Sequence, residues 1–183
     1  MAKGKPMKLV EYPDREMLAM QLAQDLAGEL RNALSLNPTA SFAVPGGTSP
    51  GPVFDMLRAA DLDWDRVHVM LTDERWVDED DPQSTARLIK DRLLVDKAAA
   101  AHFVPFYRAG LQTADGAAAV ADSLAAQMPL SLLMLGMGDD MHTASLFPGA
   151  DGVQAAMAPD APLLCAVTPE GQTPRVSLPA HAL

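Results

Sequence analysis

The stretch 129-PLSLLMLGMGDDMHTASLFPG-149 joins an apolar run to a glycine-rich loop that carries a single histidine. Residues 129–135 have the length and composition of a buried strand, and the glycines that follow end it and let the backbone approach a ligand. Ligands of open α/β sheets bind at the C-terminal ends of strands, so His142 is expected in a functional position. Met141 stands between Asp140 and His142, where a glycine would be easier to explain.

Strand-like and helix-like segments alternate along the rest of the chain. Residues 14–34 predict an amphipathic helix, because leucines recur at every fourth position from Leu18 to Leu30 and Asp14 can cap it. Further strands are expected over 41–44, 67–71, 102–106, 163–167 and 175–178, and further helices over 50–60, 84–95 and 115–127. This alternation predicts right-handed βαβ units and a mostly parallel sheet covered by helices on both faces.

The composition is that of a globular protein. The 183 residues suit a single domain over 1–183, with 49% apolar and 21% charged residues. The net charge is −10 and no cluster of Lys and Arg occurs, so nucleic acid is not an expected partner. Arg175 is the only cation from residue 109 to the end, so an anionic substrate must be held by a few placed arginines and backbone N–H groups.

The cysteine count and the hydropathy bear on the compartment. Cys165 is the only cysteine, so no internal disulfide can form and a reducing compartment is expected. No apolar stretch reaches about 18 residues, which argues against a membrane segment, and the first residues do not read as a signal peptide. We therefore expect a cytoplasmic protein without membrane contact. Four scattered histidines and one cysteine favour no metal site.

A first loop, 45-PGGTSP-50, follows the expected strand at 41–44. Gly46 and Gly47 let the backbone approach an anion, and a helix start supplies free N–H groups. Thr48 and Ser49 add hydroxyl donors. The loop is not a Walker A sequence, since it lacks the lysine, and the alternative is a tight turn in which Thr48 or Ser49 caps the next helix.

A second loop begins with Asp73, Glu74 and Arg75, directly after the expected strand at 67–71. The guanidinium of Arg75 can clamp a phosphate or a carboxylate through its fork of donors. The alternative is an ion pair at the surface with one of the many neighbouring acids.

The histidine loop admits several readings. It is not a dinucleotide-binding turn, because Met141 replaces the third glycine and the acidic residues would repel a pyrophosphate. Ser145 is not placed as a nucleophile, since no G-x-S-x-G elbow is present. A histidine beside a carboxylate, here Asp140, suits general-base activation of water, whereas a lone histidine with a structural role is the alternative.

Together, PGGTSP, TDER, GMGDDMHTASLFPG and 173-TPRVSL-178 resemble the 6-phosphogluconolactonase family in motif, order and spacing, from about residue 9 to the C-terminus. The resemblance implies a three-layer α/β/α, Rossmann-like fold related to glucosamine-6-phosphate deaminase, with no metal or organic cofactor. It also implies hydrolysis of 6-phospho-D-glucono-1,5-lactone to 6-phosphogluconate in the oxidative pentose phosphate pathway. The partner would be a small phosphorylated sugar lactone, and the protein a monomer or homodimer.

Site roles follow from the same resemblance. His142 would be the general base for the attacking water, and Asp140 would orient its imidazole or contact the sugar. The substrate-binding set would hold the phosphate and offset developing negative charge; it comprises Gly46, Gly47, Thr48, Ser49, Asp73, Arg75 and Arg175.

Two larger departures from the family pattern stand out, with a milder one beside them. Met141 replaces a family glycine, and if that position needs a positive φ the strain is about 1–2 kcal/mol. The methionine side chain is then expected to intrude on the site. Thr85 replaces an asparagine, which is milder. The sequence also ends at PAHAL, so the fold is expected to lack the family's last helix and strand.

Two rival functions remain open at this point. One is a sugar-phosphate isomerase or deaminase of the related fold, although SLFPG stands after the histidine where the deaminase pattern has an AFNEP-like segment. The other is a non-catalytic sugar-phosphate-binding protein in which Met141 and the shortened C-terminus have ended turnover.

Overall fold

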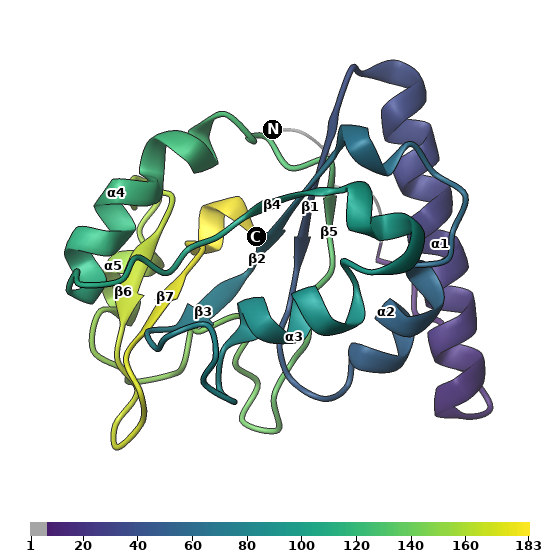
Figure 1. Cartoon of the computed structure of the whole chain (residues 1–183). Helices are drawn as coiled ribbons and strands as arrows, with labels where there is room; N and C mark the ends of the chain where they lie inside the picture. The colour runs from purple at the N-terminus through teal and green to yellow at the C-terminus, as the bar shows by residue number, and fades with distance from the viewer. Residues whose placement is uncertain (1–6) are drawn as a thin grey trace.

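The computed structural model describes residues 7–183, in which the strands form two sheets (Figure 1). The first sheet is parallel, in the order β4-β2-β1-β5, with bounds β1 Ala40–Val44, β2 Val67–Leu71, β4 His102–Val104 and β5 Leu132–Leu133. The second sheet is antiparallel, in the order β3-β7-β6, with bounds β3 Asp73–Arg75, β6 Cys165–Val167 and β7 Arg175–Ser177.

Helices lie on both sides of the parallel strands. The α-helices are α1 Arg15–Leu36, α2 Gly51–Leu57, α3 Thr85–Arg92, α4 Thr113–Ala125 and α5 Val153–Ala156, and the short 3₁₀ helices are η1 Trp64–Arg66, η2 Asp96–Ala100 and η3 Ala180–Ala182. Figure 1 shows α1 and α2 to one side of the strands, and α4 and α5 with β6 and β7 to the other. The expected α/β fold with a mostly parallel central sheet is confirmed. None of the helices within 7–183 is long and apolar enough to cross a membrane.

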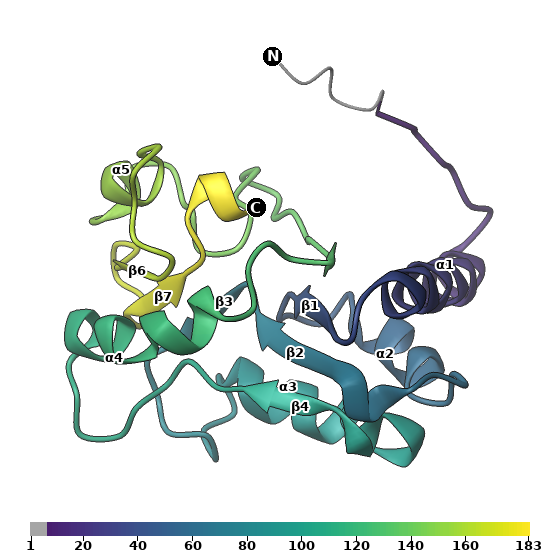
Figure 2. The ribbon, with the colours of Figure 1, turned by 90° about the horizontal axis from the view of Figure 1, so that it is seen from above.

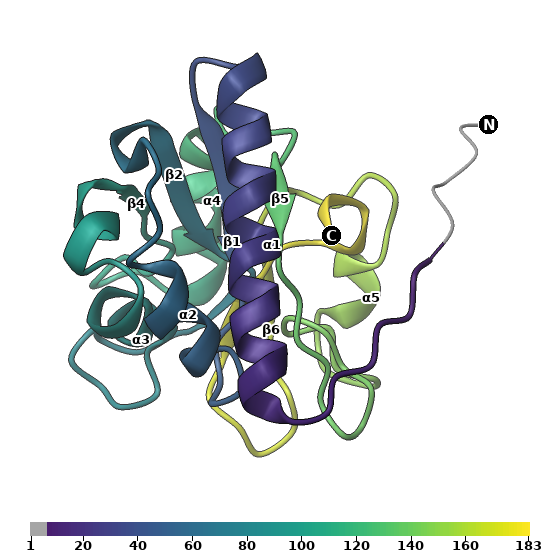
Figure 3. The same ribbon diagram turned by 90° about the vertical axis from the view of Figure 1, so that its right-hand side faces the viewer.

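Helix α1 forms as its sequence predicts. The carboxylate of Asp14 accepts a hydrogen bond from the N–H of Met17 at 2.8 Å, which caps the first turn. Leu26 and Leu30 are buried against the sheet, whereas Leu18 is 39% exposed. Figure 3 shows this long helix running across β1 and β5. Alanines at 19, 23 and 27 share the buried face, and Ala23 and Ala27 lie beside α2.

The parallel strands carry the core and fix where the loops start. All five residues of β1 are buried. Phe42 of β1 and Val69 of β2 have no exposed surface. Because both faces are covered, the sequences of β1 and β2 are mostly apolar, interrupted only by Ser41 and His68. The N–H of Thr72 donates to the carbonyl of Val44 at 2.9 Å, so the two loops that follow β1 and β2 begin side by side.

The antiparallel sheet corrects the sequence-based prediction for residues 73–75, which are a strand and not a loop. The strands expected at 163–167 and 175–178 are present as β6 and β7, but they join β3 instead of the parallel sheet (Figure 2). The run expected as a strand over 129–135 contributes only β5 to the ladder. Pairing between segments about a hundred residues apart has no local sequence signature, which explains the first two errors.

Two predicted helix caps are also wrong. Helix α2 has Pro50 at its N-cap position and no side-chain cap, so neither Thr48 nor Ser49 caps it. Helix α4 starts at Thr113, which places Asp115 in the first turn and Gln112 at the cap position. The hydroxyl groups before α2 are therefore free for another role.

Candidate active site

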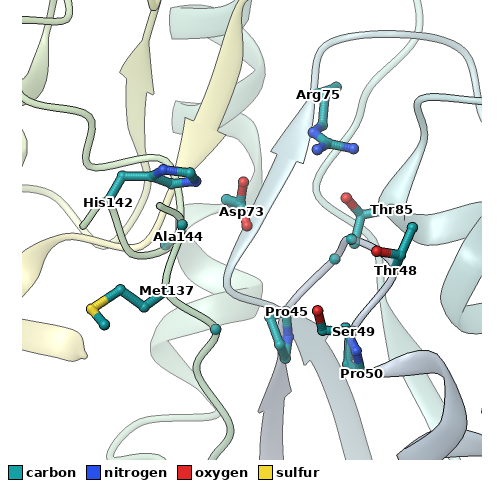
Figure 4. Close-up of a pocket in the computed structure, with 14 residues that line it drawn as sticks. Pro45, Thr48, Ser49, Pro50, Asp73, Arg75, Thr85, Met137, His142 and Ala144 are labelled. Atoms are coloured by element: carbon teal, nitrogen blue, oxygen red, sulfur yellow. The ribbon is translucent and has the colours of Figure 1, made fainter. Parts of the chain in front are cut away.

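A cavity of about 300 Å³ opens at the C-terminal ends of β1, β2 and β5, where the three loops meet. It is lined by Pro45, Gly46, Gly47, Thr48, Ser49, Pro50, Asp73, Arg75, Thr85, Gly136, Met137, Gly138, His142 and Ala144. Figure 4 shows the imidazole of His142 and the carboxylate of Asp73 on one side, with Arg75, Thr85, Thr48 and Ser49 on the other. The structure thus brings together seven of the nine predicted site residues, all except Asp140 and Arg175.

The turn after β1 packs directly on Thr85. A Cβ atom at Gly46 would lie 2.8 Å from the Oγ1 of Thr85, so the close approach requires glycine here. Gly47 has a φ of +90°, which an L side chain rarely adopts. These two glycines therefore shape the wall of the cavity.

Asp73 is fixed by hydroxyl groups from two segments. Its carboxylate accepts from the Oγ1 of Thr72 at 3.1 Å and from the Oγ of Ser145 at 2.6 Å. The N–H of Ser145 donates to the Oγ of Ser177 at 3.2 Å. Because the Ser145 hydroxyl is fully buried and donates to Asp73, it is not placed to attack a substrate.

Glu74 has a role that the sequence analysis missed. Its buried carboxylate accepts from the N–H groups of Thr85 at 2.7 Å and Ala86 at 2.8 Å, and so caps α3 together with Ser84. Burial raises the pKa of Glu74, although the hydrogen bonds from Thr85, Ala86 and Arg75 lower it in part. The acceptor lies eleven residues before the first residue of the helix, so no local capping pattern predicts it.

Arg75 and Arg175 differ in their relation to the cavity. Arg75 lines it, and its Nη1 donates to the carbonyl of Gln83 at 2.9 Å. Arg175 does not line it; its Nη2 donates to the Oε1 of Gln172 at 2.6 Å. Among residues 7–183, three side-chain atoms are buried without a hydrogen-bond partner, namely the Nε of Arg75, the Nε of Arg175 and the Oγ1 of Thr85. Thr85 is thus a polar group on the cavity wall that the sequence analysis did not count as substrate-binding.

His142 is held at one edge by Asp140. Its Nδ1 lies 2.5 Å from the Oδ1 of Asp140, and this hydrogen bond lowers the pKa of the carboxylate. With Nδ1–H donating to Asp140, Nε2 carries the lone pair that can accept a proton. Asp140 itself does not line the cavity. One face of the imidazole stacks on Phe147, with the ring centroids 3.9 Å apart.

Met141 adopts a φ of +65°, so the position does favour glycine. Its side chain is 78% exposed and does not line the cavity, so the expectation that it intrudes on the site is wrong. The glycine on which the imidazole depends is Gly138. A Cβ atom there would lie 2.2 Å from the Cε1 of His142.

Within the described residues, no group of three or more His, Cys, Asp or Glu side chains is arranged to hold a metal ion. The cavity residues supply a base, the carboxylate of Asp73, three hydroxyls, a guanidinium and backbone N–H groups, and this set can activate water and bind an anion.

Comparisons with known proteins show which family the chain resembles. A curated relative named 6-phosphogluconolactonase from Rhizobium meliloti (strain 1021) is 44% identical over 158 residues, which are 85% of this chain and 67% of the relative. One from Mesorhizobium japonicum is 40% identical over 172 residues, which are 93% of this chain and 67% of the relative. The chain thus spans about two thirds of the length of these relatives.

Solved structures of the same kind share the fold. The crystal structure of a 6-phosphogluconolactonase from Shewanella baltica OS155 superimposes with a TM-score of 0.90 at 33% identity, over 93% of this chain and 74% of that one. Residues 13–183 also match the sequence model of a family described as glucosamine-6-phosphate isomerases/6-phosphogluconolactonase. The resemblance seen in the motifs is confirmed, and the chain belongs to the glucosamine-6-phosphate isomerase/6-phosphogluconolactonase family.

Proposed function

We propose that this chain hydrolyses 6-phospho-D-glucono-1,5-lactone to 6-phosphogluconate, with His142 activating the attacking water. The observation that carries the proposal is that His142, oriented by Asp140, shares one cavity with Arg75 and the turn 46–49. The names of the relatives support the same reaction.

The reaction needs one base and an anion-stabilising wall. The Nε2 of His142 accepts a proton from water as the water oxygen attacks the lactone carbonyl carbon. The carbonyl electron pair moves to the oxygen, and N–H donors of the cavity wall offset the resulting negative charge. When this intermediate collapses, the bond from the carbonyl carbon to the ring oxygen breaks, and the ring oxygen takes the proton from the imidazolium. The carboxylic acid product then ionises.

The opposite wall holds the phosphate in this proposal. The backbone of Gly46 and Gly47 and the hydroxyls of Thr48 and Ser49 provide donors, and Arg75 provides the charge. The Nε of Arg75 is buried and has no partner within 7–183, so a bound phosphate oxygen would remove an unfavourable desolvation. Asp73, fixed by Thr72 and Ser145, accepts from a sugar hydroxyl.

The direct test is to follow lactone consumption with freshly generated substrate, because the lactone also hydrolyses spontaneously. We expect His142→Asn to lower kcat by roughly 10²- to 10⁴-fold, the usual contribution of a general base. His181→Asn is the matched control. His181 does not line the cavity, and its Nε2 contacts the carbonyl of Ala161. Equal rates for wild type and His142→Asn would remove the imidazole from the mechanism.

Two further measurements on the same purified protein distinguish the lactonase from its two rival functions. Release of ammonia from glucosamine 6-phosphate would assign the chain to the deaminase branch of its family. Binding of 6-phosphogluconate without any turnover would instead support a non-catalytic binding protein. The outward orientation of Met141 removes intrusion of its side chain into the cavity as a reason for the second alternative.

A further inference from the structure

Phe147 contacts two functional side chains that come from different elements. The imidazole of His142 stacks on its ring with a centroid distance of 3.9 Å and an interplanar angle of 20°. The Cζ of Arg175, on β7, lies 4.8 Å from the centroid of the same ring. Phe147 is almost fully buried and does not line the cavity. One aromatic ring therefore connects the expected base to an arginine outside the site.

Asp140 alone does not determine the plane of the imidazole. It holds a single edge of the ring through Nδ1, and its own side chain is 58% exposed. A hydrogen bond at one edge leaves rotation about that bond open, whereas a stacked face resists it. The Phe147 ring supplies this second restraint through dispersion and the stacked geometry that aromatic rings prefer.

Arg175 in turn restrains Phe147. Its guanidinium is anchored by the bond from Nη2 to Gln172, and a cation over an aromatic ring is attracted by the ring quadrupole. Its backbone is fixed in the ladder between β3 and β6. Arg175 is thus held by the antiparallel sheet, and its guanidinium packs on Phe147, which belongs to the same loop as His142.

We propose that Phe147 is a positioning residue for His142, and that Arg175 acts on the reaction through Phe147 without contacting the substrate. This inference rests on the proposed function of His142. It differs from the phosphate-binding role that the family resemblance suggests for Arg175, because the guanidinium packs on the aromatic ring and does not line the cavity.

The stacking is tested first by NMR on the unliganded protein, which does not depend on turnover. The chain has four histidines, and loss of one imidazole signal set in His142→Asn assigns His142. The ring current of Phe147 shifts the His142 carbon-bound protons upfield. We expect Phe147→Leu to move them downfield and Phe147→Tyr, which keeps the ring, to leave them close to wild type. No movement in Phe147→Leu overturns the stacking.

Phe103→Leu is the matched control. Phe103 lies on the edge strand β4 with the Nζ of Lys90 5.4 Å from its ring centroid, so it loses the same kind of ring and cation contact away from the cavity. We expect this variant to keep the His142 signals and kcat of the wild type. A fall of kcat in Phe103→Leu as large as in Phe147→Leu would reduce the Phe147 effect to general loss of packing and overturn the proposal.

Kinetics then separate positioning from substrate binding. If Phe147 and Arg175 orient the base, Phe147→Leu and Arg175→Met lower kcat by roughly 10- to 100-fold with little change in KM, as small misplacements of catalytic groups do. The double variant should lose no more than the worse single variant, because both changes act on one unit. A raised KM and weaker binding of 6-phosphogluconate in Arg175→Met, with kcat retained, would return Arg175 to the phosphate site.

Failure of the proposed function is distinguishable from failure of this inference. If the wild type hydrolyses no lactone while the His142 signals respond to Phe147→Leu, the reaction is wrong and the stacking stands. If the wild type is active but neither the signals nor kcat respond to the Phe147 and Arg175 variants, the positioning role is wrong.

Discussion

Arg75 and Arg175 are direct partners in the register of the antiparallel sheet, where β3 and β7 run side by side. Two guanidinium groups are thereby placed on neighbouring strands. Burial lowers the pKa of Arg175, and the positive charge of Arg75 lowers it further, whereas Asp73 acts in the opposite direction. Only Arg75 of this pair lines the cavity, so a phosphate group bound at this edge is expected to take its charge partner from Arg75 and not from Arg175.

Replacement of Arg75 by methionine tests that assignment. We expect KM to rise by roughly 10- to 100-fold, because a hydrogen bond to a charged group contributes about 1.5–3 kcal/mol. Arg75→Lys should lie between wild type and Arg75→Met, since lysine keeps the charge but not the fork of donors. Steady-state kinetics with the lactone measure both. Arg87→Met, on the exposed face of α3, is the control and should keep the KM of the wild type. An unchanged KM in Arg75→Met would move the phosphate elsewhere.

Gly138 sets the position of the imidazole in the same cavity. A Cβ atom there would meet the Cε1 of His142 at 2.2 Å, and its Nδ1 at 2.4 Å, so Gly138→Ala must displace the ring. We expect kcat to fall by roughly 10- to 100-fold with a small change of KM. Gly136→Ala, in the same loop, meets nothing within 4 Å and should have a clearly smaller effect. Comparable losses in the two variants would show that the loop and not the contact with His142 is at fault.

The parts of this site that the sequence predicted are those with a local signal. The turn 45–50 and the loop after residue 135 announce themselves through glycines that follow apolar runs, and β1 and β2 through their continuous hydrophobicity. The single-domain organisation, the cytoplasmic location and the monomeric or homodimeric state stay predictions.

The parts that the sequence did not predict depend on distant pairing. The strand nature of residues 73–75 follows from their ladder with β7, about a hundred residues later. The cap that Glu74 gives to α3 and the stack of His142 on Phe147 likewise arise only once the loops are folded. For Met141, the sequence correctly indicated a strained backbone. It could not predict that the side chain points to solvent, because the surrounding fold sets that direction.

Glu74 makes stability depend on pH in a defined direction. Its pKa is raised above the ordinary value of 4.5, so the folded protein keeps this proton to a higher pH than the unfolded chain. The folded state then binds more protons in the window between the two pKa values, and the free energy of unfolding falls as pH rises through that window. The side chain of Glu74→Gln cannot ionise, so its free energy of unfolding lacks this decrease with pH. Its amide also loses one acceptor for the N–H groups of α3.

Urea unfolding at a series of pH values from about 4 to about 8 measures the effect. The advantage of wild type over Glu74→Gln should shrink as pH rises above 4.5 and level off once the folded protein has lost the proton. Glu29→Gln, at an exposed position of α1, corrects for the loss of one negative charge. A wild-type advantage that grows with pH would show that the hydrogen bonds outweigh burial and that the pKa of Glu74 is lowered.

Met141→Gly should stabilise the protein without changing its chemistry. A non-glycine residue at a φ of +65° is strained by about 1–2 kcal/mol, and glycine removes this strain at the cost of about 0.4–1 kcal/mol in the freer unfolded chain. The free energy of unfolding is therefore expected to rise by roughly 0.5–1 kcal/mol, measured by urea unfolding. Met157→Gly is the matched control: Met157 is also exposed but has a φ of −86°, so the same change should destabilise. Because the Met141 side chain points to solvent, kcat and KM for the lactone should stay close to wild type. A large gain of activity in Met141→Gly would mean instead that the strained residue displaces His142, and that the methionine limits catalysis.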